Sequence, residues 1–195
     1  MPDSIALDST RLQRLQQIPL WDFALAFYAK PGVEAACLTL QDEAGLDVCE
    51  VLFHCWLYSC GLEAVSTAVS AVRKERLHWQ ARVTDVLRAL RRDLTSSAAS
   101  NEAVAALRKT IKQAELMAER ENLQRWQIWA LEVKIDEKCV TNIVEKPSNV
   151  AEWLEKKLNH GEKAFQFTGS SNTPSASLQA LQTLVRQLDP HQGAR

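Results

Sequence analysis

The segment DVCEVLFHCWLYSC, residues 47–60, is the strongest indicator of the fold because it is apolar on nearly every side of a helix. Asp47 is a good N-cap for such a helix, and Gly61 ends it. A helix without a polar face has to be covered all round, so it belongs at the centre of a bundle. We therefore predict an all-α fold: a single helical bundle of about six main helices with a flexible C-terminal tail.

Helical patterns continue on both sides of this stretch. Residues 20–30, LWDFALAFYAK, carry a broad apolar stripe that ends at a Pro-Gly pair. Residues 33–43 predict a second helix, which Gly45 closes in a left-handed conformation. On the other side of the central stretch, residues 62–73 predict a short amphipathic helix.

The pattern over residues 75–94 predicts a longer helix with separate apolar and polar faces. Its inward stripe consists of Trp79, Val83, Val86, Leu87, Leu90 and Leu94. Its outward face carries Arg82, Asp85, Arg88 and Arg92. Residues 95–100, TSSAAS, are then expected to form a linker.

A helix with charges of alternating sign begins at Glu102 and reaches the 120s, and its apolar phase slips near Asn122. After the slip, residues 128–136 fit a strand as well as a helix. We choose helix, because no neighbouring segment offers a second strand with a hairpin turn. Residues 150–160 predict one more helix, stopped by Gly161.

The two ends of the chain differ from its middle. Residues 1–18 are mostly polar and are interpreted as an N-terminal appendage, and residues 19–165 as the helical domain. Residues 166–177, QFTGSSNTPSAS, have the composition of a linker. We therefore expect residues 166–195 to form a flexible linker and a short terminal helix.

Composition excludes several classes of protein. The 195 residues are 46% hydrophobic and 24% charged, with six glycines and six prolines, so the chain is neither collagen-like nor wholly disordered. The 23 basic and 24 acidic residues give a net charge of -1, unlike a dedicated nucleic-acid binder. Residues 1–70 are acidic (three basic, nine acidic) and residues 71–95 basic (seven against three), which predicts pairing within the chain.

The five cysteines are expected to be reduced thiols. The count is odd, no Cys-x-x-Cys pair occurs, and four of the five lie in apolar runs. The first residues carry no signal-peptide pattern, and the longest apolar run is too short to cross a bilayer. These features predict a cytoplasmic protein without a membrane partner.

One group of polar residues suggests chemistry. Asp47, Glu50, His54 and Tyr58 fall at spacings of three, four and four on the central helix, and Asp42 lies just before it. A carboxylate beside an imidazole can act as an acid/base pair or hold a metal ion. The alternative is an ordinary pair of side chains on a helix face. No second carboxylate-His motif and no known catalytic or phosphate-binding motif occurs, so we expect no metal and no cofactor.

Two further sets of residues are candidates for binding a partner. Trp126 and Trp129 lie next to the phase slip, where an exposed patch or partner groove would fit. Arg88, Arg91 and Arg92 belong to the basic stretch.

The segment LWDFALAFYAKPGVEAACLTLQDEAGLDVCEVLFHCWL, residues 20–57, resembles the opening of the DUF2390 family, bacterial proteins of unknown function. LRALRR at 87–92 with Trp79, and IKQAELMAERENL at 111–123, fit the family as well. The resemblance implies a small helical bacterial protein, and it carries no activity or site. Glu50 and His54 stand where the family is usually apolar, which predicts that the polar stripe is peculiar to this chain.

Three hypotheses of different classes follow for the function. The first is a non-enzymatic cytosolic interaction or adaptor protein with an unidentified protein partner, its oligomeric state left open. The alternative is a small helical enzyme or a metal- or ligand-binding protein that uses Asp42, Asp47, Glu50 and His54. The third is association with RNA or the ribosome through Arg82, Arg88, Arg91 and Arg92, which the near-neutral charge disfavours.

Overall fold

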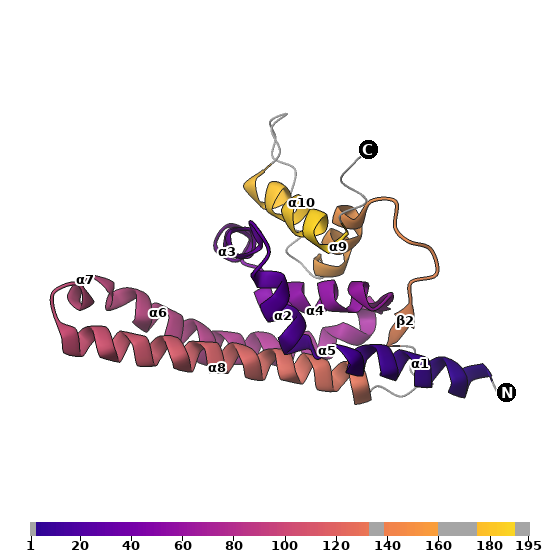
Figure 1. Cartoon of the computed structure of the whole chain (residues 1–195), viewed down its shortest axis with the longest axis horizontal. Coiled ribbons are helices and arrows are strands. Elements are labelled where there is room, and N and C mark those ends of the chain that lie inside the picture. Colours follow the sequence, from indigo (N-terminus) through magenta and orange to yellow (C-terminus); the bar gives the residue numbers. More distant parts are fainter. Residues whose placement is uncertain (1–2, 133–138, 160–174, 190–195) are drawn as a thin grey trace.

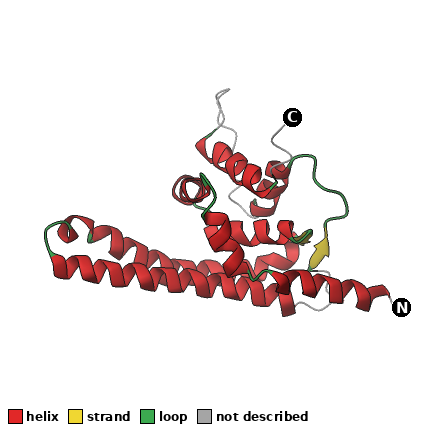
Figure 2. Ribbon diagram, viewed as in Figure 1, coloured by secondary structure: helices red, strands yellow, loops and turns green. Residues whose placement is uncertain are grey.

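Helix α4 (Val48–Ser59) lies at the centre of the computed structural model, which describes residues 3–132, 139–159 and 175–189 (Figure 1). Every residue from 49 to 58 is buried. Asp47 caps the helix as predicted: its Oδ1 accepts a hydrogen bond of 2.9 Å from the Cys49 N–H. The all-α prediction is confirmed, although the described residues form more helices than the six main ones expected (Figure 2).

Three helices precede α4. They are α1 (Asp3–Gln17), α2 (Leu20–Tyr28) and α3 (Val33–Ala44). Gly45 closes α3 with a φ of 64°, a left-handed conformation that glycine adopts without strain. Helix α1 is tied to the body, because Leu15 is fully buried and the Ile18 carbonyl accepts a 2.8 Å hydrogen bond from Trp56 Nε1.

The chain after α4 builds a long helical hairpin. It consists of α5 (Ser66–Trp79), the π turn η1 (Gln80–Thr84), α6 (Asp85–Asp93), α7 (Thr95–Ala98) and α8 (Glu102–Glu132). The predicted linker at 95–100 therefore contains a helical turn, α7. At 1.5 Å per residue α8 is about 46 Å long. Figure 1 shows α6, α7 and the outer part of α8 extending beyond the rest of the molecule; we call residues 85–110 the arm.

A two-stranded antiparallel sheet corrects one sequence prediction. Strand β1 (Leu62–Ala64) pairs with β2 (Val140–Asn142), so the first part of the predicted helix at 62–73 is a strand. The partner strand lies almost 80 residues away and leaves no local signal. The choice of helix is confirmed up to Glu132; residues 133–138 lie outside the described residues.

Two helices complete the fold. Helix α9 (Val150–Leu158) is capped by Asn149, and α10 (Ala176–Leu188) is capped by Ser175. Helix α10 packs on α3 and α9, with its Ala180, Leu181 and Leu184 buried in the main core. The terminal helix thus covers the body of the protein; most of the linker expected before it falls outside the described residues.

The π turn changes which faces of the hairpin meet. A π turn adds one residue to the helical repeat and so rotates every later side chain by about 100°. Beyond η1 the predicted pattern is therefore wrong for Val86, Leu90 and Arg88, whereas Leu87 and Leu94 are partly buried and Arg92 is exposed as predicted. Val86 and Leu90 are 57% and 47% exposed, whereas Arg88, predicted to face outward, lies against α8 with 11% of its side chain exposed.

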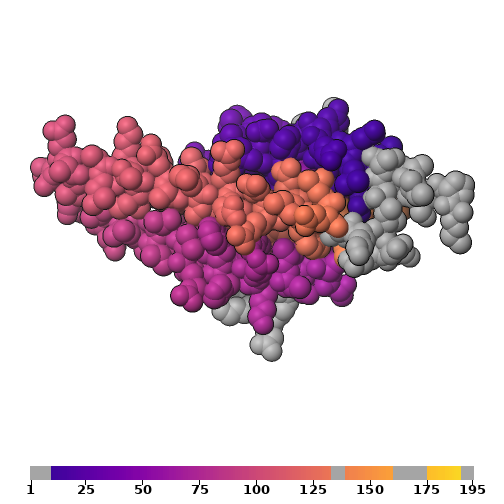
Figure 3. All heavy atoms as spheres, turned by 90° about the horizontal axis from the view of Figure 1, so that it is seen from below, coloured from indigo at the N-terminus to yellow at the C-terminus, as the bar shows by residue number. Residues whose placement is uncertain are grey.

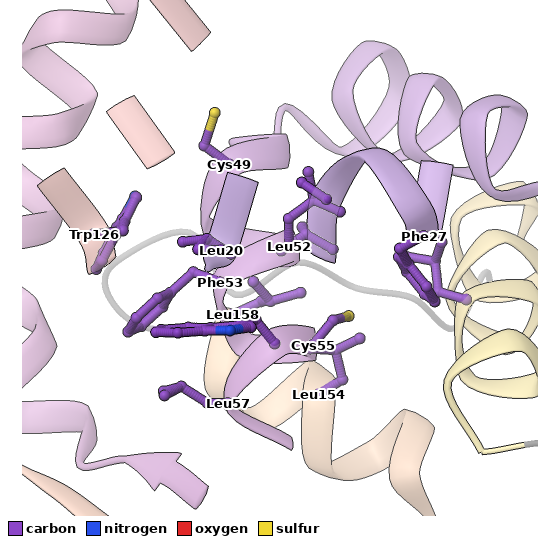
Figure 4. Close-up of a cluster of buried hydrophobic side chains, with 14 of the residues drawn as sticks. Leu20, Phe27, Cys49, Leu52, Phe53, Cys55, Leu57, Trp126, Leu154 and Leu158 are labelled. Carbon is purple, nitrogen blue, oxygen red and sulfur yellow. The ribbon is translucent and has the colours of Figure 1, made fainter. Parts of the chain in front are cut away.

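The core is centred on aromatic contacts between α4 and α8. Trp126, predicted to mark an exposed patch, is fully buried, and its ring stacks on Phe53 with centroids 4.6 Å apart (Figure 4). Trp129 is partly buried and meets Phe53 edge-on at 5.9 Å. Both indoles therefore pack α8 against α4. Among the described residues, no helix is long and apolar enough to cross a membrane.

Trp126→Ala is expected to lower the free energy of unfolding by about 3–5 kcal/mol, because it removes a buried indole and leaves a cavity beside Phe53. Urea unfolding followed by circular dichroism measures this loss. The matched control is Ile128→Ala on the same helix, where the side chain is 40% exposed and the expected loss is about 1 kcal/mol or less. Equal losses for the two variants would contradict the core position of Trp126.

Candidate functional site

Asp47 accepts hydrogen bonds from two elements, its own helix α4 and helix α8. Besides capping α4, it accepts through Oδ2 a hydrogen bond of 3.4 Å from the Asn122 side-chain amide. Burial raises the pKa of Asp47 from its ordinary value of 3.8 to about 6, while the hydrogen bonds from Cys49 and Asn122 act in the opposite direction. Asn122 is fully buried, and its Oδ1 has no hydrogen-bond partner among the described residues.

Glu50 and His54 lie one turn further along α4, in a different environment. Arg73 of α5 donates through Nε to both Glu50 oxygens, at 2.7 and 3.0 Å, and through Nη2 to Glu50 and to the Lys157 carbonyl. Burial alone would raise the pKa of Glu50, but His54 and Arg73 together hold it below its ordinary value. Burial lowers the pKa of His54, whose Nε2 is 3.5 Å from Glu50 Oε1, so the imidazole is neutral at pH 7.

Tyr58 and Asp42 lie in two other environments, apart from Glu50 and His54 and from each other. Tyr58 donates a 3.0 Å hydrogen bond to Asp189, just after α10, and Asp189 also pairs with Lys146 at 2.5 Å. Asp42 is exposed at the end of α3, 3.3 Å from Arg92. The structure therefore separates the residues that the sequence placed on one stripe, and only Glu50 and His54 stay together.

The polar groups and cysteines of the described residues do not come together as metal ligands. No group of three His, Cys, Asp or Glu side chains in the described ranges is arranged to hold a metal ion. All five cysteines are free thiols, and Cys37, Cys49 and Cys55 are buried. Burial raises the pKa of the Cys37 thiol to about 12, as it raises that of Cys49. These buried thiols are therefore protonated core residues.

The basic stretch pairs mainly with α8. Arg88 donates to Glu115 at 3.0 Å, to Glu119 at 2.9 Å and to Asp85 at 2.8 Å. Arg91 donates to both oxygens of Glu115. Pairing with the acidic first third of the chain occurs for Arg73 with Glu50 and for Arg92 with Asp42. Glu115 and Glu119 of α8 were not predicted as partners, although their spacing of four residues puts both on one helix face.

Three of these arginines, Arg88, Arg91 and Arg92, line a pocket of about 200 Å³ between α2, α3, α4, α6 and α8. We call it the α2–α8 pocket. Its walls are mainly apolar. Residues that line it include Trp21, Ala24, Leu25, Tyr28, Leu38, Asp47, Val48, Cys49, Leu52, Leu116 and Leu123. The charged part is formed by Arg88, Arg91, Arg92, Glu115 and Glu119. Of the residues singled out from the sequence, Asp47 and the three arginines meet here.

Glu50→Gln is expected to lower the free energy of unfolding by about 3 kcal/mol, because it leaves the Arg73 guanidinium buried without its counter-charge. Glu152→Gln is the control, since Glu152 pairs with Lys156 on the surface of α9 and its loss should leave the melting temperature nearly unchanged. Thermal unfolding at pH 7 compares the two. Similar melting temperatures would show that Arg73 does not depend on Glu50.

Substitutions of Asp47 separate its capping role from its charge. The folded state binds the Asp47 proton more tightly than the unfolded state, so this group's contribution to stability is present below pH 3.8 and lost as the pH rises through about 6. Asp47→Asn keeps a side chain that can cap α4, and it removes the loss of stability that Asp47 causes as the pH rises. Rotation of the Asn122 side-chain amide lets its oxygen accept a hydrogen bond from the new amide. The variant should therefore gain stability relative to the parent between pH 4 and pH 7.

Asp47→Ala is the comparison and should cost about 1 kcal/mol at pH 4, where only the cap is lost. Urea unfolding of the parent and both variants at a series of pH values measures these differences. A stability difference between parent and Asp47→Asn that stays constant with pH would contradict the raised pKa.

Residues 19–126 match the family described as "Protein of unknown function (DUF2390)". The match covers more than half of the chain and includes every residue that lines the α2–α8 pocket. No curated protein and no solved structure matches the chain significantly.

Proposed function

The chain belongs to the DUF2390 family, whose description gives no activity. From the exposed surface of the chain, we propose that it is an interaction protein whose arm binds an acidic amphipathic helix of another protein. The observation that carries this proposal is the uncovered state of the arm. Helix α6 has no buried residue. Figure 3 shows the atoms of the arm standing clear of the rest of the molecule.

The arm offers apolar side chains that its own hairpin does not cover. Val86 and Leu90 lie one turn apart on the same face of α6, and they are 57% and 47% exposed. Leu107, on the facing helix α8, is 52% exposed. A pair of helices with exposed apolar residues is completed when a third helix packs against it, which is a common mode of peptide recognition.

Charge indicates which kind of helix would bind. The arm contains five basic and three acidic side chains, and two more basic residues, Arg82 and Lys112, lie directly beside it, although the whole chain has a net charge of -1. Arg88 and Arg91 are held by α8, but Arg82, Lys109 and Lys112 are exposed and pair with no described carboxylate. Surface cations around apolar residues favour an acidic partner and exclude basic ones. Because the two innermost arginines are already paired, the arm suits a protein better than a phosphate backbone.

Site-specific cross-linking tests the proposal. p-Benzoylphenylalanine at position 86 is expected to capture an acidic amphipathic helix in the cells that make the protein. The same probe at position 144, where Val144 is 94% exposed on the loop between β2 and α9, should not capture it. A synthetic peptide of the captured segment should bind the parent, with a dissociation constant that rises with salt concentration.

The peptide should bind Val86→Glu at least tenfold more weakly than the parent, while Val144→Glu should bind it unchanged. Capture of nuclease-sensitive RNA would replace the proposal with the nucleic-acid hypothesis. Capture of a second copy of this chain, equal capture at both positions, or equal peptide binding by Val86→Glu would also overturn it.

A further inference from the structure

The α2–α8 pocket has the walls of a binding site for a small molecule. It lies between five helices and is partly open to solvent, and Trp21, Leu52 and Leu123 contribute apolar surface to it. Its volume of about 200 Å³ is below the range of about 300 Å³ and more that is typical of sites for drug-sized ligands. The space therefore fits a small molecule with a mainly apolar body.

The two glutamates of the pocket are already paired with arginines, and Asp47 is hydrogen-bonded. Glu115 and Glu119 are held by Arg88 and Arg91, and Asp47 is held by the Cys49 N–H and the Asn122 amide. A cationic ligand would have to break an arginine–glutamate pair before it gained either glutamate as a partner. The part of the pocket that Arg91 and Arg92 line thus opposes a positively charged ligand.

The positive groups of the pocket retain capacity to bind. The side chain of Arg92 is 52% exposed, and its partner Asp42, 3.3 Å away, is equally exposed. Such surface pairs contribute about 1 kcal/mol or less, so another carboxylate can take the place of Asp42. Arg91 uses Nε and Nη2 for Glu115, which leaves Nη1 as a further donor.

We propose that the α2–α8 pocket binds a small amphipathic carboxylate, with its apolar body against Trp21, Leu52 and Leu116 and its carboxylate on Arg91 and Arg92. This site is separate from the apolar face of the arm on α6. Two guanidinium groups give the carboxylate charge-assisted hydrogen bonds, and the apolar walls remove the rest of the ligand from water.

Isothermal titration calorimetry with three probes of equal chain length tests both halves of the proposal. The probes are octanoate, 1-octanol and octylamine, each titrated at pH 7.5 and low ionic strength. Octanoate is expected to bind one molecule per chain, at least tenfold more tightly than 1-octanol. Octylamine, protonated at this pH, is expected to bind more weakly still. Arg92→Gln should reduce the affinity for octanoate toward that for 1-octanol.

A matched pair of variants on α8 locates the site. Leu116 and Leu107 are 49% and 52% exposed on the same helix, but only Leu116 lines the pocket. Leu116→Glu should weaken octanoate binding at least tenfold, whereas Leu107→Glu should leave it unchanged; circular dichroism confirms that both variants are folded. Unsaturable octanoate binding, equal affinities for the three probes, or equal effects of the two glutamates would overturn the proposal.

The pocket and arm proposals fail independently. Octanoate binding by Leu107→Glu does not depend on whether the arm has a protein partner. Peptide binding by the arm, in turn, is read out at position 86, which does not line the pocket. Were Leu116→Glu to misfold, Arg92→Gln on the exposed end of the site would still decide the question.

Discussion

Helix α4 is excluded from water on every side, and the other elements are arranged around it. Ten consecutive residues of this helix are buried, so no side of it can face solvent. The cover comes from α2, α3, α8, α9 and β1, which lie far apart in the sequence. Full burial of a large apolar side chain such as Phe53 or Leu57 stabilises the fold by about 1.5–3 kcal/mol, and an incomplete cover would give only part of this gain. The aromatic contacts of Trp126 and the packing of α10 on α3 both serve that closure.

The polar residues of α4 determine how its cover is oriented. Glu50 would be costly to bury alone, and Arg73 compensates its charge while also reaching the Lys157 carbonyl on α9. Lys157 in turn donates to the Ala64 carbonyl on β1 at 2.9 Å. Four elements are thus linked by directional bonds in a region otherwise held by non-directional apolar contacts. Buried pairs of this kind contribute little net stability compared with apolar packing, and their effect here is to fix the placement of α5 and α9 relative to α4.

The π turn connects the two surfaces for which we propose functions. By rotating α6, it directs Arg88 and Arg91 toward the glutamates of α8, where they form the charged side of the α2–α8 pocket. The same rotation turns Val86 and Leu90 toward solvent. A regular α-helix through residues 80–84 would have placed these apolar residues inward and left the arginines on the surface. The charged side of the α2–α8 pocket and the exposed apolar face of the arm therefore both result from one local change in helical repeat.

Local sequence patterns were enough to predict the central helix, its Asp47 cap, the Gly45 turn, the helical fold class and the family resemblance. Each of these depends on periodicity or on side-chain chemistry within a few neighbouring residues. The pairing of β1 with β2, the burial of Trp126, the phase of α6, and the separation of Asp47, Glu50 and Tyr58 into different environments became visible only in the folded chain. Those outcomes depend on partners such as Asn122, Arg73 and Asp189, which are 23 to 131 residues away. Local patterns specify which side chains need partners, and long-range packing selects which partners they meet.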